Sequence, residues 1–337
     1  MSDRTPRKNI PAFLLKLTIS LTLLAFIILP RAAIPDILRE LRSVNMYWIL
    51  FSFSLHALGV WISAVRWRIL IRALGDSVPL GYLVKSYLVG TFFNNFLPTR
   101  FGGDIVRIWD GSLYSRSLLR SSAVVLVERL TGVVILLLLA LTASLIRLDM
   151  AREFPVIWLA MALALGGLAA IFAFLTPISE KLIRLLPGAG FWGKVRHKAL
   201  EFRETVLAYR GQKTAILKAL FWALLLQINV IVHYYLAGKG FGLAVPLLDY
   251  FIFIPVVLLV LTIPITIGGL GVREGLYIQI LGYYAIPASA AVAFSLIADT
   301  AFTLAIGLIG AFVYITRKKP GEVSPGPEND TIRQTNE

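Results

Sequence analysis

The chain has 337 residues, of which 58% are hydrophobic and 15% are charged, and its formal net charge is +14. Soluble globular chains are about 45–50% apolar and about 25% charged, so this composition excludes an ordinary water-soluble domain. The absence of cysteine excludes disulfides, thiolate metal sites and a cysteine nucleophile. The basic residues lie mostly in short segments between apolar runs, a pattern typical of contact with anionic lipid headgroups rather than nucleic acid.

Six apolar runs are long enough to cross a bilayer, which takes about 20 residues of helix. These predicted spans are roughly Phe13–Pro30, Met46–Val65, Ser121–Ile146, Pro155–Pro177, Thr214–Leu236 and Ala288–Ile315. The first run follows a basic N-terminus, as in a signal peptide, but no small-residue cleavage site follows it, so we expect a retained span. The predicted fold class is therefore all-α, a polytopic transmembrane helical bundle.

Two further apolar regions, Leu80–Leu118 and Val245–Pro287, are interrupted, and we expect each to form a broken, re-entrant helix pair. The basic segment Ser179–Lys213 is polar and partly amphipathic, which predicts a cytoplasmic loop with one surface helix. Residues 317–337 are rich in Pro, Gly and polar side chains, which is typical of a disordered tail. We expect one transmembrane domain over residues 1–316 and no soluble catalytic domain.

One twelve-residue motif occurs in both interrupted regions. FLPTRFGGDIVR (Phe96–Arg107) aligns without a gap to TIPITIGGLGVR (Thr262–Arg273), at a constant offset of 166 residues. Five of the twelve positions are identical: a proline, two adjacent glycines, a valine and an arginine. An acidic residue inside an apolar helix follows each copy, Glu128 in the first and Asp299 in the second. The match indicates an internal duplication, and the alternative is two unrelated Pro/Gly turns.

The distribution of Lys and Arg predicts the orientation. The positive-inside rule places the N-terminus and residues 66–72, 179–213 and 317–319 in the cytoplasm. The first interrupted region must then enter and leave the membrane by the cytoplasmic side, and the second by the outer side. This is an inverted-topology repeat, with half-repeats at about 46–177 and 214–316, in an inner (plasma) membrane with both termini cytoplasmic. Arg31, Arg39 and Arg42 count against this layout because it puts them outside.

The broken helices suit an anion. Half-helices that follow the glycine pairs would direct free N–H groups and partial positive charge into the interior, and arginine binds two oxygens of a phosphate or carboxylate. The candidate headgroup-binding residues are Asn94, Asn95, Thr99, Arg100, Gly102, Gly103, Asp104, Arg107, Gly268, Gly269 and Arg273. The alternative is that the arginines only pair with acidic residues to hold the bundle together, and both interpretations can hold.

Charges inside spans should face each other or a cavity, because each costs roughly 2.5–3.5 kcal/mol near a helix centre on insertion scales. The candidate charge-pairing or proton-linked residues are Glu128, Arg129, Glu274 and Asp299. Gln227, Asn229 and His233 are weaker candidates, since a lone polar residue often only bonds a neighbouring helix. Interfacial anchoring is the predicted role of most aromatic residues near span ends, which are Trp48, Trp61, Trp67, Tyr234, Tyr235, Tyr283 and Tyr284.

The chain resembles the lysylphosphatidylglycerol synthase transmembrane-region family of flippase-like membrane proteins. The resemblance covers about residues 12–316 and rests on Arg66-Trp67, NNFLPTRFGGDIVR (Asn94–Arg107), Glu128-Arg129 and IPITIGGLGVREG (Ile263–Gly275). It implies a lipid-flippase-like membrane domain, to which some members add a separate soluble domain for aminoacyl transfer. No such domain is evident in this sequence, so the resemblance does not imply lysyltransferase activity. Other relatives are associated with glycolipid, polyprenyl-linked sugar or hopanoid handling, so it does not fix the substrate.

The leading hypothesis is a flippase or transporter, not an enzyme, that handles an anionic or phosphate-bearing lipid such as a phospholipid, a polyprenyl-linked glycolipid or a hopanoid-related lipid. The second is a membrane-embedded lipid-modifying transferase with Asp104, Glu128 or Asp299 as general base. The third is an accessory subunit that docks a membrane enzyme through the basic segment. Membrane lipids are the expected partners, no cofactor, metal or nucleic acid is expected, and the oligomeric state stays open.

Overall fold

The computed structural model describes residues 34–96, 102–187, 190–262, 266 and 268–317, together with Thr18 and Thr22. All regular secondary structure in these residues is helical, which confirms the predicted fold class. The elements are α2 (Ile34–Arg42), α3 (Met46–Ala73), α4 (Leu80–Phe96), α5 (Gly102–Ser115), α6 (Leu118–Ile146), α7 (Leu148–Glu153), α8 (Pro155–Phe174), α9 (Pro177–Arg184), α10 (Gly190–Leu207), η1 (Ala208–Gly211), α11 (Lys213–Gly240), α12 (Leu247–Val260), α13 (Val272–Gly282), α14 (Ala288–Ser295), η2 (Leu296–Ala301) and α15 (Phe302–Thr316).

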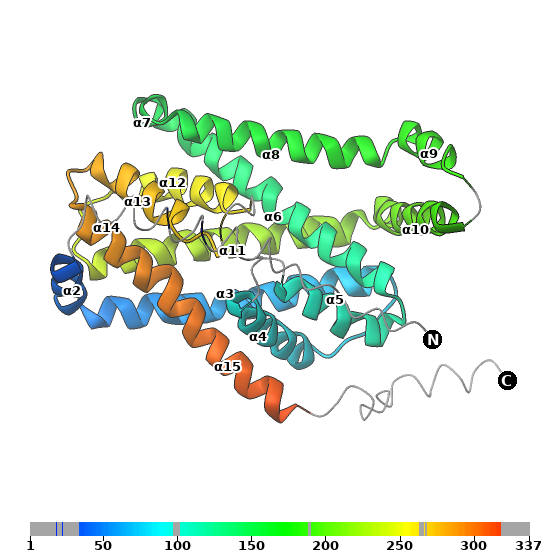
Figure 1. Ribbon diagram of the computed structural model, residues 1–337, viewed down its shortest axis with the longest axis horizontal. Helices are drawn as coiled ribbons and strands as arrows, with labels where there is room; N and C mark the ends of the chain where they lie inside the picture. Colours follow the sequence, from blue (N-terminus) through cyan, green and yellow to red (C-terminus); the bar gives the residue numbers. More distant parts are fainter. Residues whose placement is uncertain are drawn as a thin grey trace.

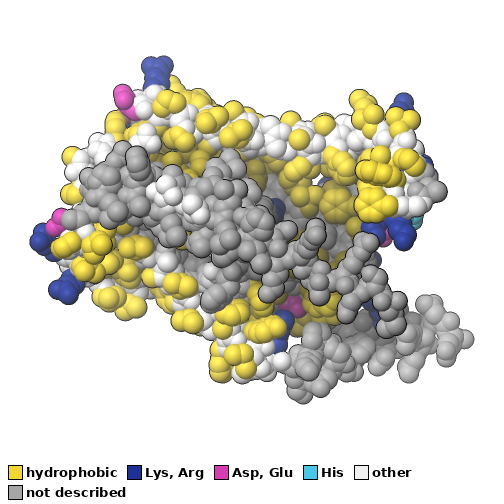
Figure 2. Space-filling model, viewed as in Figure 1, with side chains coloured by type: hydrophobic (Ala, Val, Ile, Leu, Met, Phe, Trp, Pro, Cys, Tyr) yellow, Lys and Arg dark blue, Asp and Glu magenta, His cyan; other side chains and the backbone are white. Residues whose placement is uncertain are grey.

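Five helices are long and apolar enough to cross a membrane: α3, α6, α8, α11 and the continuous helix formed by α14, η2 and α15. They coincide with five of the six predicted spans, and the other, Phe13–Pro30, lies outside the described residues. In Figure 2 the described side chains between the two ends of the long axis are mainly hydrophobic, and most visible Lys and Arg side chains lie at those ends. This is the distribution that a lipid environment requires.

Helices α3 and α11 form a long antiparallel pair, as Figure 1 shows. The Asn45 N–H, just before α3, donates to the Gly240 carbonyl at the end of α11 over 2.9 Å. Polar contacts along the pair include Asn229 Nδ2 to the Leu55 carbonyl at 2.9 Å, and the Ser52 hydroxyl 2.8 Å from His233 Nδ1. Asn229 and His233 therefore bond the neighbouring helix in this structure.

Two helical hairpins, α4–α5 and α12–α13, are built from helices of 17, 14, 14 and 11 residues. Hairpin α4–α5 lies toward the end of the bundle that carries α9 and α10, and α12–α13 toward the end with α2 and α7 (Figure 1). Helix α4 packs on α15, and α12 packs on α6, so each hairpin contacts a long helix from the other half of the chain. At the first contact, a Cβ on Gly310 would lie 1.9 Å from the Leu88 carbonyl oxygen, so this approach requires glycine.

The basic segment differs from its prediction, because it forms two helices, α9 and α10, rather than one. Pro177 begins α9 after the span α8 ends, and Pro187 separates α9 from α10, because proline cannot donate a backbone hydrogen bond within a helix. The buried Arg203 of α10 donates to Glu180 of α9 over 2.8 Å and to the Thr176 carbonyl over 3.0 Å. These bonds attach α10 to the end of α8.

Candidate functional site

The carboxylate of Glu128, on α6, is the centre of a buried ion-pair cluster formed by α3, α4, α5 and α6. Arg66 of α3 donates to its Oε1 over 2.9 Å, and the Tyr87 hydroxyl of α4 donates to the same oxygen. Arg107 of α5 binds the other oxygen, Oε2. The Glu128 side chain is 1% exposed, so its charge is neutralised by these partners rather than by water.

Arg107 also contacts the aromatic and acidic residues around it. Its guanidinium carbon lies 4.5 Å from the centroid of the Trp67 ring and 4.0 Å from that of Tyr87, which places a cation over two aromatic faces. Its Nη1 lies 3.3 Å from Asp104 Oδ1, and the second oxygen of Asp104 binds Nε of Arg129. The cluster therefore joins three arginines to two carboxylates, which leaves one net positive charge.

The first glycine pair serves a close approach of two helices. The Gly103 N–H at the start of α5 donates to Asn94 Oδ1 over 2.6 Å. A Cβ on Gly103 would lie 2.6 Å from the Gly90 carbonyl oxygen of α4. A side chain at this position would therefore separate α4 from α5. We predicted a free N–H group for an anion here, but Asn94 already occupies the Gly103 N–H.

The second glycine pair has a different physical role, although its sequence is identical. Gly268, Gly269 and Gly271 have φ angles of 62°, 82° and 84°, in the left-handed region that favours glycine. Gly271 precedes α13, and its N–H donates to Glu274 Oε2 over 2.7 Å. This N–H group is therefore also taken by a side chain of the protein rather than left for a ligand.

A second buried cluster surrounds Arg273 and Glu274 at the start of α13. Arg273 binds Glu274 Oε1 through Nη2 at 2.6 Å and donates from the same nitrogen to the Thr300 hydroxyl at 2.8 Å. Ser295 donates to Glu274 Oε1 over 2.9 Å, and Arg273 Nε lies 3.8 Å from Asp299 Oδ2. One arginine faces two carboxylates, so this cluster carries one net negative charge, opposite to the first.

Asp299 lies in η2, a π-helical turn between α14 and α15, where an extra residue per turn redirects the side chains. Its Oδ1 accepts a hydrogen bond of 2.6 Å from the Tyr234 hydroxyl of α11. Tyr234 and Trp67 are buried, so the predicted interfacial anchoring is wrong for these two residues. Both lie near the end of an apolar run in the sequence, yet both turn toward charged residues in the interior.

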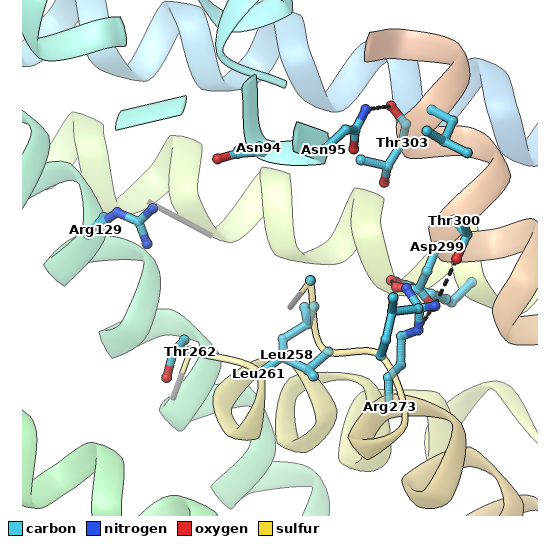
Figure 3. A pocket seen from close by; sticks show the side chains of 14 residues that line it. Asn94, Asn95, Arg129, Leu258, Leu261, Thr262, Arg273, Asp299, Thr300 and Thr303 are labelled. Carbon is cyan, nitrogen blue, oxygen red and sulfur yellow. Dashed lines mark hydrogen bonds and ion pairs between the residues drawn. The ribbon is translucent and has the colours of Figure 1, made fainter. Parts of the chain in front are cut away.

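The ends of α4 and α12 and the start of α13 border a cavity of about 460 Å³, which Figure 3 shows from close by. Residues from both halves of the chain line it: Asn94, Asn95, Arg129, Tyr234, Leu258, Leu261, Thr262, Gly268, Leu270, Arg273, Asp299, Thr300, Thr303 and Leu304. Asn95 Nδ2 donates to the Thr303 carbonyl over 3.2 Å, which connects the first hairpin tip to α15. The lining combines two guanidinium groups, one carboxylate and several neutral hydrogen-bonding groups.

The predicted site residues fall into three groups. Those that line the cavity are Asn94, Asn95, Arg129, Gly268, Arg273 and Asp299. Those that lie in or beside the two clusters without lining the cavity are Gly102, Gly103, Asp104, Arg107, Glu128, Gly269 and Glu274. Thr99 and Arg100, with Pro98 and Pro264 of the motif, lie outside the described residues. Sequence reasoning missed Tyr87, Tyr234, Ser295 and Thr300, whose types are common in transmembrane helices.

Fold and site together define a polytopic α-helical membrane protein with a polar cavity between two buried ion-pair clusters. The chain belongs to the family described as lysylphosphatidylglycerol synthase TM region, which matches residues 13–310. The predicted resemblance is thereby confirmed.

Two curated relatives from Methanothermobacter thermautotrophicus are both named UPF0104 membrane protein. One is 23% identical over 338 residues, which covers 92% of this chain and 95% of the relative. The other is 25% identical over 276 residues, which covers 75% of this chain and 80% of the relative. No solved structure matches the chain.

Proposed function

We propose that this protein moves an anionic or phosphate-bearing lipid between the two leaflets of the plasma membrane, with both termini in the cytoplasm. The observation that carries the proposal is the cavity between the ends of α4 and α12, which belong to two hairpins from opposite ends of the bundle. A ligand held there lies between the two membrane faces, which is the position of the substrate site in many transporters.

The charge of the cavity favours an anion. Arg129 and Arg273 line it together with one carboxylate, that of Asp299, so the lining has one net positive charge when all three are ionised. The carboxylates that pair with the two arginines, Asp104 and Glu274, do not line the cavity. Arginine binds two oxygens of a phosphodiester at once, while the amides of Asn94 and Asn95 supply neutral hydrogen bonds. Since the helix N-terminal N–H groups of Gly103 and Gly271 are occupied, we assign headgroup recognition chiefly to the two guanidinium groups.

An inverted repeat relates the two hairpins in this proposal. The first half consists of α3, α4, α5 and α6, and the second of α11, α12, α13 and the continuous helix α14–η2–α15. The leading helices, α3 and α11, have 28 residues each, and the closing helices, α6 and α14–η2–α15, have 29 residues each. The leading helices α3 and α11 are antiparallel, as inversion requires. Helix α4 of the first half packs on α15, in the closing helix of the second half, and α12 of the second half packs on α6, the closing helix of the first. The contacts between the halves are therefore equivalent in both directions.

Two ion pairs between the halves would act as latches at opposite ends of the bundle. Arg147, directly after α6, binds the buried Asp249 of α12 over 2.6 Å, and Tyr284 donates to the same carboxylate over 2.5 Å. Arg317, directly after α15, binds the buried Asp110 of α5 over 2.8 Å. Release of one latch at a time would open the cavity to one side at a time, as alternating access requires.

The experiment is leaflet exchange in phosphatidylcholine vesicles that contain headgroup-labelled phosphatidylglycerol or a labelled polyprenyl phosphate. Dithionite added outside reduces only the label that reaches the outer leaflet. Arg129→Gln should slow exchange by at least about tenfold, because a hydrogen bond to a charged group contributes about 1.5–3 kcal/mol and 1.4 kcal/mol is tenfold. Arg152→Gln, on the exposed surface of α7, is the control and should exchange at the wild-type rate. Exchange of neither probe by the wild-type protein would overturn the proposal.

A membrane-embedded lipid-modifying transferase, or an accessory subunit of one, is the second candidate. Asp299 favours it, because this carboxylate lines the cavity and its Oδ2 accepts no hydrogen bond from the described residues. Such an oxygen could remove a proton from a lipid hydroxyl. Turnover of a labelled donor by the purified protein, lost in Asp299→Asn and kept in Arg129→Gln, would favour this candidate over transport.

A further inference from the structure

Two apolar cavities lie between α6 and α8, outside the polar cavity. The smaller, of about 190 Å³, is lined by α6, α8 and the end of α12. The larger, of about 380 Å³, has only hydrophobic side chains in its lining: Val134, Leu137, Leu138, Leu141, Trp158, Met161, Ala162, Leu165 and Leu168. We call the two together the α6–α8 trough.

Shared lining residues place the trough directly beside the polar cavity. Thr262, at the tip of the second hairpin, lines both the polar cavity and the smaller apolar one. Leu168 of α8 lines both apolar cavities. On α6, Arg129 faces the polar cavity and the next residue, Leu130, faces the trough. The two cavities therefore lie against neighbouring faces of α6 at the same height.

We infer that the α6–α8 trough holds the hydrocarbon tail of the same lipid whose headgroup lies at Arg129 and Arg273. This inference rests on the proposed function and narrows its substrate to an amphiphile with a long chain. A polar cavity beside an apolar trough matches the two ends of a lipid, whereas a water-soluble anion would leave the apolar part unused.

The trough also has a defined place along the membrane normal. The α6 residues of the larger cavity, Val134 to Leu141, lie in the second half of that helix, whereas those of the smaller cavity, Leu130 and Val133, lie at its middle. The α8 residues of the two cavities together run from Trp158, near α7, to Ile171. Helices α6 and α8 meet at α7, at the end of the bundle opposite to α9 and α10 (Figure 1). The tail would therefore extend from the middle of the bundle, beside the polar cavity, toward the α7 side, and the headgroup would enter the cavity sideways between α6 and α8.

Two adjacent glycines in α8 provide a matched test. Gly167 lines the trough and Gly166 does not, and a Cβ at either position would meet nothing within 4 Å. Phenylalanine should therefore be tolerated sterically at both, with equal effects on helix propensity. Gly167→Phe should fill the trough and slow exchange of labelled phosphatidylglycerol severalfold, while Gly166→Phe should exchange at the wild-type rate. Equal rates in the two variants, with Arg129→Gln inactive, would overturn the tail site and leave the proposed function standing.

A binding measurement tests the tail site without transport. Phosphatidylglycerol with a photoreactive diazirine in one acyl chain is irradiated with the wild-type protein in phosphatidylcholine vesicles, and the labelled peptides are mapped. We expect labelling on the facing residues of α6 and α8 that excess phosphatidylglycerol suppresses and excess diacylglycerol does not. The same labelling should fall in Gly167→Phe and persist in Gly166→Phe. Labelling spread over all lipid-facing helices, with no competition, would overturn the inference.

Discussion

Replacement of Glu128 by glutamine tests whether the first cluster holds the membrane domain together. The substitution keeps the shape of the side chain but removes the charge that Arg66 and Arg107 share, and it places an amide N–H₂ group against guanidinium donors. Both arginine side chains are at most 8% exposed, so water cannot replace the lost partner. Removal of one member of a buried ion pair costs about 3–5 kcal/mol.

The size of the loss in the free energy of unfolding separates two explanations of how Glu128 stabilises the protein. If only hydrogen bonds mattered, the free energy of unfolding would fall by about 0.6 kcal/mol, the average measured for a hydrogen bond between transmembrane helices. Loss of the shared carboxylate should instead lower the free energy of unfolding by about 3–5 kcal/mol for Glu128→Gln. Equilibrium unfolding in mixed micelles measures this, with Glu153→Gln, on the exposed surface of α7, as a control.

A double-mutant cycle completes the test. Arg66→Gln combined with Glu128→Gln removes both members of one pair, so the double variant should be less destabilised than the sum of the single variants. Additive losses, or a loss below about 1 kcal/mol for Glu128→Gln, would refute the conclusion that Glu128 neutralises its arginine neighbours.

Three further predictions follow from packing, the latches and surface charge. Gly310→Ala should impair folding, measured as monodisperse yield, because the new methyl group would overlap a carbonyl oxygen of α4. Because the chain lacks cysteine, Thr262→Cys gives a single label site in the cavity, and Asp249→Asn should raise its labelling by an impermeant maleimide from the α7 side only. Hydrogen bonds from Arg184 lower the pKa of Glu180, so contacts of α9 with α10 should persist above the ordinary pKa of 4.5 and weaken below it, as hydrogen exchange would show.

The spans could be predicted from the sequence because hydrophobicity over about 20 residues depends little on tertiary contacts. The interior of the bundle could not. Adjacent residues of a helix point about 100° apart, so the neighbouring residues Glu128 and Arg129 contact different partners. A hydropathy profile averages over both residues and cannot separate their directions. A tyrosine in an apolar helix has the same pattern at an interface as beside a buried carboxylate, which is why Tyr234 was assigned to the interface and Tyr87 was given no role.

The glycine pairs show a similar limit. The identical residues predicted one shared role at the two hairpin tips, but the first pair permits a close approach of helices and the second permits left-handed backbone. Only the contacts of Gly103 with α4 and the φ angles of Gly268 and Gly269 separate these roles. A duplicated motif thus indicates common descent of two segments more securely than a common conformation.

The charges divide the protein into parts that would move and parts that would not. Among the described residues, every ion pair of the two buried clusters joins residues of one half: the Glu128 cluster within α3–α6, and the Arg273 cluster within α13 and η2. In the part of the chain that the structure describes, the ion pairs between charged side chains of the two halves are those of the latches, whose arginines are 27% and 20% exposed. Water can solvate a released latch arginine but not a released cluster arginine. In the proposed transport cycle, each half should therefore move as a rigid body, with the latches breaking in turn and the clusters intact.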